Sequence, residues 1–78
     1  MERAIVLVNA TPGGEDSVLR DLKGTKSVLE IHQLYGLYDL LAIVEAEDDQ
    51  GVKAVISSKF RSHPNVASTL TMKVVNIF

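Results

Sequence analysis

The chain has 78 residues, of which 46% are hydrophobic, and it contains no cysteine and no tryptophan. A domain this small usually gains only about 3–5 kcal/mol from its core and needs disulfides, a structural metal or self-association, and the lack of cysteine leaves self-association as the expected route. The formal net charge of −2, with no basic stripe, excludes a typical duplex-binding module, so we expect no direct contact with nucleic acid.

The first predicted strand is the β-branched apolar run Ala4–Val8. This run and Leu40–Val44 are the longest uninterrupted apolar runs, and both are far shorter than the roughly 18 residues of a membrane span. The N-terminal apolar run is also too short for the core of a signal peptide. We therefore expect a cytoplasmic protein without membrane contact.

A turn and an amphipathic helix follow. Pro12-Gly13-Gly14 predicts the turn, because proline fixes one φ and glycine tolerates positive φ. Glu15 and Asp16 are typical of a helix N-terminus, and Gly24 is a predicted C-cap. The expected buried stripe of this helix comprises Val18, Leu19 and Leu22.

The middle of the chain predicts a hairpin. From Ser27 the pattern alternates, which would place Leu29, Ile31 and Gln33 on one face and Val28, Glu30, His32 and Leu34 on the other. Tyr35–Asp39 interrupts this strand, and Gly36 suits a positive-φ turn position. Leu40–Ala46 then predicts a second, buried strand.

A second helix and a last strand complete the chain. Glu47-Asp48-Asp49 predicts a helix start with an aspartate as N-cap, and His63-Pro64-Asn65 predicts the helix end. Val66–Val75 alternates as the last strand. The buried stripe of the helix is expected to comprise Val52, Val55, Ile56 and Phe60.

The order β-α-β-β-α-β predicts an α+β, ferredoxin-like sandwich formed by residues 1–78 as a single domain, with four antiparallel strands and both helices on one face. The other face is expected to be apolar as well, with Ala67, Thr69, Thr71 and Val75 on it. An apolar face without a helix over it implies a partner surface. We therefore expect a homodimer joined through the sheets and assembled further into a ring.

Residues typical of catalysis are scarce. The sequence has no cysteine nucleophile, no glycine fingerprint for nucleotides and no phosphate loop. His32 and His63 stand alone, which favours solvated or structural roles over metal binding, and Asp48-Asp49 is better explained by helix capping than by acid–base chemistry. We expect no enzymatic activity, no metal and no cofactor.

Three segments remain as candidate binding sites, each with a structural alternative. Tyr35–Asp39 combines two aromatic rings and a carboxylate around a glycine, but these are also ordinary turn residues. Ser68–Thr71 offers hydroxyl groups, although threonine is simply a good strand residue. Thr11–Gly14 offers backbone N–H groups to an anion, or is a plain turn.

Two of these segments resemble motifs of the Lrp/AsnC transcription regulators, in their C-terminal effector domain, the RAM domain. Tyr35–Ala42 resembles the x-Gly-x-Tyr-Asp-hydrophobic hairpin of that family. Asn65–Met72 resembles its Gly-Val-x-x-Thr-x-Thr closing strand, with Asn65 where glycine is common. The resemblance covers essentially the whole chain. Because the family's regulators carry an N-terminal helix-turn-helix domain and this chain starts directly at the first strand, it resembles a stand-alone RAM domain.

The resemblance implies a homodimer that assembles into an octamer or decamer, with small effectors, typically amino acids, bound between dimers. It implies that Gly36 supplies a backbone N–H, that Asp39 pairs with an ammonium group and that Tyr38 walls the pocket. Hydrogen bonds to the ligand's carboxylate or side chain would come from Ser68, Thr69 and Thr71. Such a module would sense a metabolite or modulate full-length Lrp/AsnC regulators, without binding DNA itself.

Three alternatives remain open at this stage. An ACT-type amino-acid-binding domain shares the element order and would place its ligand near residues 11–14. A purely structural oligomerisation module would bind nothing small. A small enzyme of the dimeric ferredoxin-like kind would need a catalytic residue facing a cavity, for which His32 is the candidate on a strand.

Overall fold

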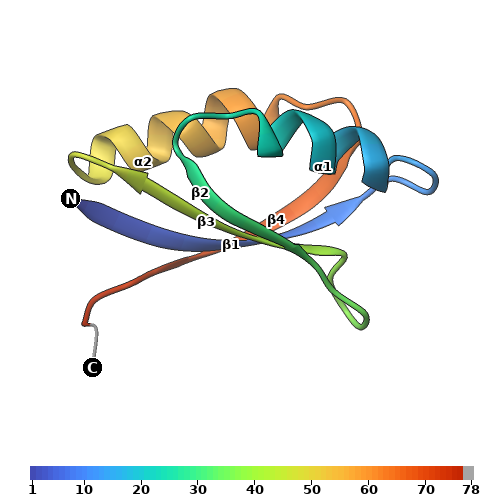
Figure 1. Cartoon of the computed structure of the whole chain (residues 1–78), viewed down its shortest axis with the longest axis horizontal. Coiled ribbons are helices and arrows are strands. Elements are labelled where there is room, and N and C mark those ends of the chain that lie inside the picture. The colour runs from blue at the N-terminus through green and yellow to red at the C-terminus, as the bar shows by residue number, and fades with distance from the viewer. Residues whose placement is uncertain (77–78) are drawn as a thin grey trace.

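The computed structural model describes residues 1–76 and shows the predicted order of elements. The strands form one antiparallel sheet in the order β2-β3-β1-β4, and the helices lie together on one side of it (Figure 1). The ferredoxin-like fold is therefore confirmed. The elements are β1 (Glu2–Ala10), α1 (Glu15–Lys23), β2 (Val28–Gln33), β3 (Leu40–Ala46), α2 (Asp49–Val55), the π-helix η1 (Ile56–Arg61) and β4 (Val66–Lys73).

A dry core fills the space between the sheet and the helices. Side chains alternate between the two faces of a strand, so every second residue of the central strand β1 points at the helices. The core residues are Ala4, Val6 and Val8 from β1, Leu40, Ala42 and Val44 from β3, and Val18, Leu22, Val52, Ile56 and Phe60 from the helices. No helix within residues 1–76 combines the length and hydrophobicity needed to cross a membrane.

The turn before α1 depends on two glycines for different reasons. Gly13 has a φ of +79°, a conformation that other residues rarely adopt. Gly14 is buried, and a Cβ there would lie 2.7 Å from Thr11 Oγ1 and 2.8 Å from Asn65 Cβ. The predicted turn is confirmed, and its second glycine is explained by close approach to the loop before β4.

The second helical region begins as predicted and continues further than an α-helix. Asp48 is the N-cap, and its Oδ1 accepts a hydrogen bond of 2.7 Å from the Gly51 N–H. From Ile56 the helix continues as η1 and ends at Arg61, before Pro64. This change of helix type has no sequence signal, because buried residues four positions apart fit an α-helix and a π-helix alike.

The alternation predicted for β2 is confirmed from Glu30 to Gln33 and is wrong at Val28. The pairing with β3 shifts register between Val28 and Glu30, which leaves Leu29 as an extra residue. Val28 and Ile31, three positions apart, therefore both pack against the core, while Leu29 is 46% exposed. A bulge of this kind reverses the faces of all the residues on one side of it.

The faces predicted for β4 are also wrong. Directly opposite residues of an antiparallel pair lie on the same face. Thr69 and Thr71 pair with the core residues Val8 and Val6, so both threonines face the helix side and not the open side.

The other predicted members of the open face are displaced too. The register of β1 and β4 shifts between Asn9 and Ala10, which leaves Ala67 as the unpaired residue at the irregularity. The strand ends at Lys73, so Val75 lies beyond it. The residues of β4 that do lie on the open side are Ser68, Leu70 and Met72, opposite Asn9, Leu7 and Ile5.

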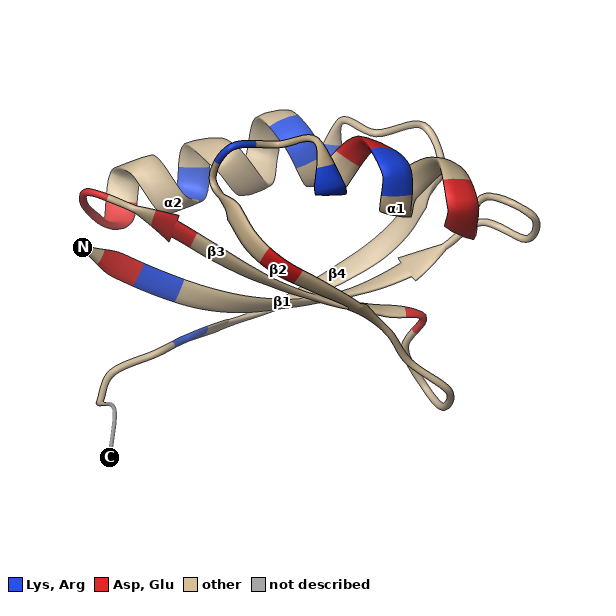
Figure 2. Cartoon of the chain, in the orientation of Figure 1, with Lys and Arg blue, Asp and Glu red and all other residues tan. Residues whose placement is uncertain are grey.

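The side of the sheet away from the helices is apolar at its centre. We call this surface the open face; its apolar residues are Ile5, Leu7, Leu41, Ile43, Leu70 and Met72. Charged residues gather at the strand ends and on the helices, while the strand centres carry few (Figure 2). An ion pair of 2.7 Å between Arg3 and Glu45 lies at one end of this face. The prediction of an uncovered apolar face is therefore confirmed, with a different set of residues.

Candidate functional site

The β2–β3 hairpin projects beyond the sheet at its lower right in Figure 1. Tyr35 and Leu37 at its tip are almost fully exposed. Gly36 has a φ of +155°, and a Cβ there would meet nothing within 4 Å, so glycine is needed for its backbone conformation rather than for space. The predicted positive-φ turn is confirmed.

Asp39 ties this hairpin to the end of β1. Its N–H donates to the Val8 carbonyl at 3.0 Å, and its carboxylate Oδ2 accepts from the Ala10 N–H at 2.8 Å. Its carbonyl accepts from the Leu34 N–H at 2.8 Å and closes the hairpin. Within residues 1–76 no hydrogen bond reaches Oδ1, so Asp39 holds the fold with one carboxylate oxygen only.

The hydroxyl groups of β4 separate onto two sides. Thr69 and Thr71 lie on the helix side of this edge strand, where Thr69 is half-buried and Thr71 is exposed because no helix covers them fully. Ser68 pairs with Asn9 and lies on the open face. Of the three predicted hydroxyl ligands, the fold therefore brings two together and separates the third.

A groove runs along β4 beneath the second helical region. We call it the β4 groove; it has a volume of about 390 Å³ and is lined by Lys53, Ile56, Ser57, Arg61 and Thr71. An adjoining groove of about 300 Å³ shares three of these residues and continues past Asp49 and Lys73 to Arg3.

Three of the lining residues were not predicted from the sequence. Lys53, Ser57 and Arg61 recur every four positions, directly after the buried Val52, Ile56 and Phe60. The spacing was a usable signal for a second stripe on the helix. What this stripe faces depends on the position of the helix over β4, which only the fold reveals.

The predicted ligand residues of the hairpin and the predicted ligand threonines of β4 lie on opposite sides of β1. Asp39 contacts the β1 end from the β3 side, while Thr69 pairs with Val8 from the β4 side. Since neighbouring strands lie about 5 Å apart, β3 and β4 are separated by about 10 Å. Neither groove that contains Thr71 includes a hairpin residue. Within one chain, Gly36, Tyr38 and Asp39 thus form one group and Thr69 and Thr71 another.

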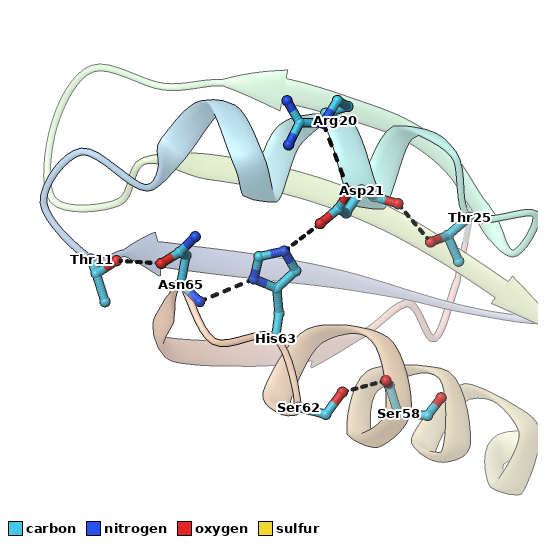
Figure 3. A network of polar contacts seen from close by, with 8 residues as sticks. All are labelled: Thr11, Arg20, Asp21, Thr25, Ser58, Ser62, His63 and Asn65. Atoms are coloured by element: carbon cyan, nitrogen blue, oxygen red, sulfur yellow. Dashed lines mark hydrogen bonds and ion pairs between the residues drawn. The ribbon is translucent and has the colours of Figure 1, made fainter.

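His63 has a structural role (Figure 3). Its Nε2 lies 2.7 Å from Asp21 Oδ2, and its Nδ1 accepts a hydrogen bond of 3.0 Å from the Asn65 N–H. Both ring nitrogens are therefore engaged, and the side chain is only 9% exposed. The network joins α1 to the loop before β4. His32, by contrast, is exposed and contacts Glu30 at 3.0 Å.

The Thr11–Gly14 turn uses its own polar groups. The Thr11 N–H donates to the Asn65 carbonyl and the Gly14 N–H to the Thr11 carbonyl, both at 2.8 Å. The Thr11 hydroxyl lies 3.3 Å from Asn65 Oδ1. These bonds favour the plain turn over an anion site, and they give Asn65 a structural role at the position where the family motif has glycine.

Lys73 forms the centre of an ion triad at the far end of β4. Its Nζ lies 2.8 Å from Asp49 Oδ2 and 3.0 Å from Glu2 Oε1. The hydrogen bond from Lys73 lowers the pKa of Asp49, and the bonds to Asp49 and then Glu2 raise the pKa of Lys73. Within residues 1–76 no cluster of three or more histidine and acidic side chains is arranged to hold a metal.

Comparisons with known proteins give one family match and several matches to solved structures. The family described as the Lrp/AsnC ligand binding domain matches residues 3–78. The crystal structure of FFRP-DM1 is 31% identical, with a TM-score of 0.93, over 96% of this chain and all of that one. A hypothetical protein from Pyrococcus horikoshii is 30% identical, with a TM-score of 0.91, over 99% of this chain and 93% of that one.

Longer regulators share the fold over part of their length. A transcriptional regulator from Neisseria meningitidis, solved as a complex with L-Met, is 17% identical with a TM-score of 0.88. The match covers 96% of this chain and 50% of the regulator, so the chain spans about half of that protein. No functionally curated sequence is significantly similar to this chain. The family match favours the RAM domain over the ACT alternative: the chain belongs to the Lrp/AsnC family, as its ligand-binding domain.

Proposed function

We propose that this domain binds a small effector, an amino acid, at a site formed between copies of the chain. The observation that carries the proposal is the division of the candidate residues into two groups, each incomplete. Asp39 keeps one carboxylate oxygen free at the base of a projecting hairpin, and Thr69 and Thr71 offer hydroxyls on an uncovered edge strand. The family's ligand-binding role and the L-Met complex of the Neisseria regulator support the ligand class.

The hairpin of one copy completes the β4 groove of another. Because the hairpin projects beyond the sheet, it reaches a neighbouring molecule more readily than the threonines of its own chain (Figure 1). Asp39 pairs with the ligand's ammonium group, Gly36 contributes its N–H and Tyr38 forms a wall. Thr69 and Thr71 bind the carboxylate from the other side. Ser68, on the open face, belongs to the assembly surface rather than to the effector.

The open face supports assembly into a homodimer. Its centre consists of six apolar residues, and Leu70 and Met72 are 44% and 43% exposed in the single chain. Covering this surface with a second copy removes apolar area from water, which stabilises a domain of this size. Dimers then join through their hairpins into an octamer or a decamer.

The role of the assembly is regulatory, in the cytoplasm, without catalysis. It senses a metabolite or combines with full-length Lrp/AsnC regulators and alters their response. The charges support the absence of a DNA contact: the formal net charge is −2, and acidic segments lie at both ends of the helix layer and beside the basic segments of α1 (Figure 2).

Calorimetry and thermal unfolding with each of the twenty amino acids test the proposal. A ligand that binds only the folded protein raises its stability by about 2.7 kcal/mol at a concentration of 100 Kd. Asp39→Asn and Thr71→Val should each abolish the response. The first keeps an oxygen for the Ala10 N–H, so it removes the charge without removing the structural bond.

Ser68→Ala is the matched control, because it removes a hydroxyl from the same strand on the opposite face. If no amino acid binds while Asp39→Asn changes the size of the oligomer, the alternative of a purely structural assembly module is correct.

A further inference from the structure

We infer that the effector of this domain is a small dicarboxylate, recognised by the positive charge that Lys53 and Arg61 place over Thr71 in the β4 groove. This inference rests on the proposed function and adds the chemical class of the ligand.

The lining of the β4 groove is unbalanced in charge. Its five residues are two cations, two hydroxyl residues and one aliphatic residue, and no acidic side chain is among them. A neutral amino acid would need the hydroxyls to bind its carboxylate and would leave the two cations without a function. A ligand with a second carboxylate uses all four polar groups.

The two cations are also free to bind. Within residues 1–76, neither Lys53 nor Arg61 forms an ion pair, whereas the cations of the adjoining groove do: Arg3 pairs with Glu45, and Lys73 with Glu2 and Asp49. Asp49 in the adjoining groove is engaged first by Lys73, whose hydrogen bond lowers the pKa of that carboxyl, and the charge of Lys53 lowers this pKa further. Neither contact places an acidic side chain in the lining of the β4 groove itself.

The fold places these side chains around the β4 groove. Lys53, Ser57 and Arg61 follow one another at intervals of four residues along α2 and η1, next to the buried stripe that fixes the orientation of the helix. Thr71 faces them from β4, opposite the core residue Val6. The groove thus has a row of three polar side chains from the helix and one hydroxyl, that of Thr71, from the strand.

The chemistry of these groups suits carboxylates. The guanidinium of Arg61 presents paired donors that match the two oxygens of a carboxylate, and Lys53 adds a compact charge. The hydroxyls of Ser57 and Thr71 donate to the same oxygens. A volume of about 390 Å³ is within the range of small-molecule sites. A cationic effector would be repelled, and a purely aliphatic one would bury charges without partners.

The dicarboxylate can be an amino acid, such as glutamate or aspartate, or a keto or saturated dicarboxylic acid. Calorimetry on the intact wild-type protein with glutamate, aspartate, 2-oxoglutarate and succinate distinguishes these sources. Glutamine and asparagine serve as neutral matches of equal size. We expect a dicarboxylate to bind at least about tenfold more tightly than its amide, as the loss of one charge-assisted contact predicts. The affinity should fall with added salt.

Two variants test whether Arg61 and Lys53 cause the preference for a dicarboxylate over its amide. Arg61→Gln and Lys53→Gln should each remove most of the preference for dicarboxylate over amide while the unliganded protein keeps its melting temperature, because both side chains are exposed. Lys23→Gln is the control: it removes the same charge from the last turn of α1, outside the groove, and should leave the preference unchanged.

The outcomes separate this inference from the proposed function. If a neutral amino acid binds as tightly as any dicarboxylate, and Thr71→Val but not Arg61→Gln abolishes it, the inference is wrong and the effector site stands. If 2-oxoglutarate or succinate binds but no amino acid does, the dicarboxylate class is supported and the pairing of Asp39 with an ammonium group is wrong. If none of these compounds binds but another of the twenty amino acids does, the inference is wrong and the effector site stands; if no compound of either panel binds, both proposals fail.

Discussion

The two faces of the sheet are made of the same kind of residue and behave differently. On β1, Val6 and Val8 are fully buried, while Ile5 and Leu7, the alternate residues of the same strand, remain partly exposed. The difference lies in what covers them: two helices on one side, and no part of residues 1–76 on the other. An apolar face is therefore a core or an interface according to the layer opposite it, and hydrophobicity alone does not decide between the two.

The largest expected effect is on the covered face. Phe60→Ala empties the position of the largest fully buried side chain and should lower the free energy of unfolding by about 3–5 kcal/mol. Such a loss is comparable to the stability that a small core supplies, so we expect the variant to be largely unfolded by circular dichroism. Leu70→Ala on the open face, measured in dilute protein, should cost much less. Equal losses would remove the distinction between the faces.

The open face is tested by adding a charge to it. Leu70→Lys should leave the helical signal intact and lower the mass measured by light scattering, because a buried cation opposes pairing of the two sheets. Ala54→Lys places the same charge on the exposed side of α2 and should leave the mass unchanged. A Leu70→Lys variant that keeps the mass of the wild type would show that the copies do not meet at this face.

A smaller effect is expected at His63, whose polar contacts join α1 to the loop before β4 on the helix side of the sheet. His63→Ala removes the bonds to Asp21 and to the Asn65 N–H, and should lower the free energy of unfolding by about 1–2 kcal/mol. His32→Ala is the matched change on the open side, where the ring is exposed, and should alter the melting temperature little. Chemical denaturation of both variants checks this. A similar loss in each would mean that the contacts of His63 add no more stability than those of an exposed histidine.

The smallest expected effect is at the ion triad of Lys73. Since the pKa of Asp49 is lowered on folding, its contribution is present above its usual value of 3.8 and is lost as the pH falls through the lower folded value. Since the pKa of Lys73 is raised, its contribution is present below 10.5 and is lost as the pH rises through the higher folded value.

Lys73→Met should therefore lower the melting temperature slightly at neutral pH and low salt, with the difference vanishing in high salt because all three groups are exposed. A salt-independent loss would assign the role of Lys73 to packing of its aliphatic stem.

The features that the sequence predicts correctly are local. Gly36 and the cap at Asp48 are specified by a few neighbouring residues, and the element order follows from their succession. The wrong predictions concern the way in which the strands pair with one another. Leu29 carries no mark of its bulge, and neither does Ala67, the extra residue of β4 that moves Thr69 and Thr71 to the other side. The β4 groove was missed for the same reason, since it forms between a helix and a strand.

The π-helix η1 makes the chain tolerant of a one-residue deletion at this point. In an α-helix each residue advances the direction of the side chain by about 100°, so residues three and four positions apart lie on the same face. Deleting one residue between Ser57 and Arg61 would allow an ordinary α-helix to form, and Arg61, now three positions after Ser57, would still lie on the face turned to β4. Among relatives, a gap of one residue here would therefore mark a change of helix type rather than a change of ligand.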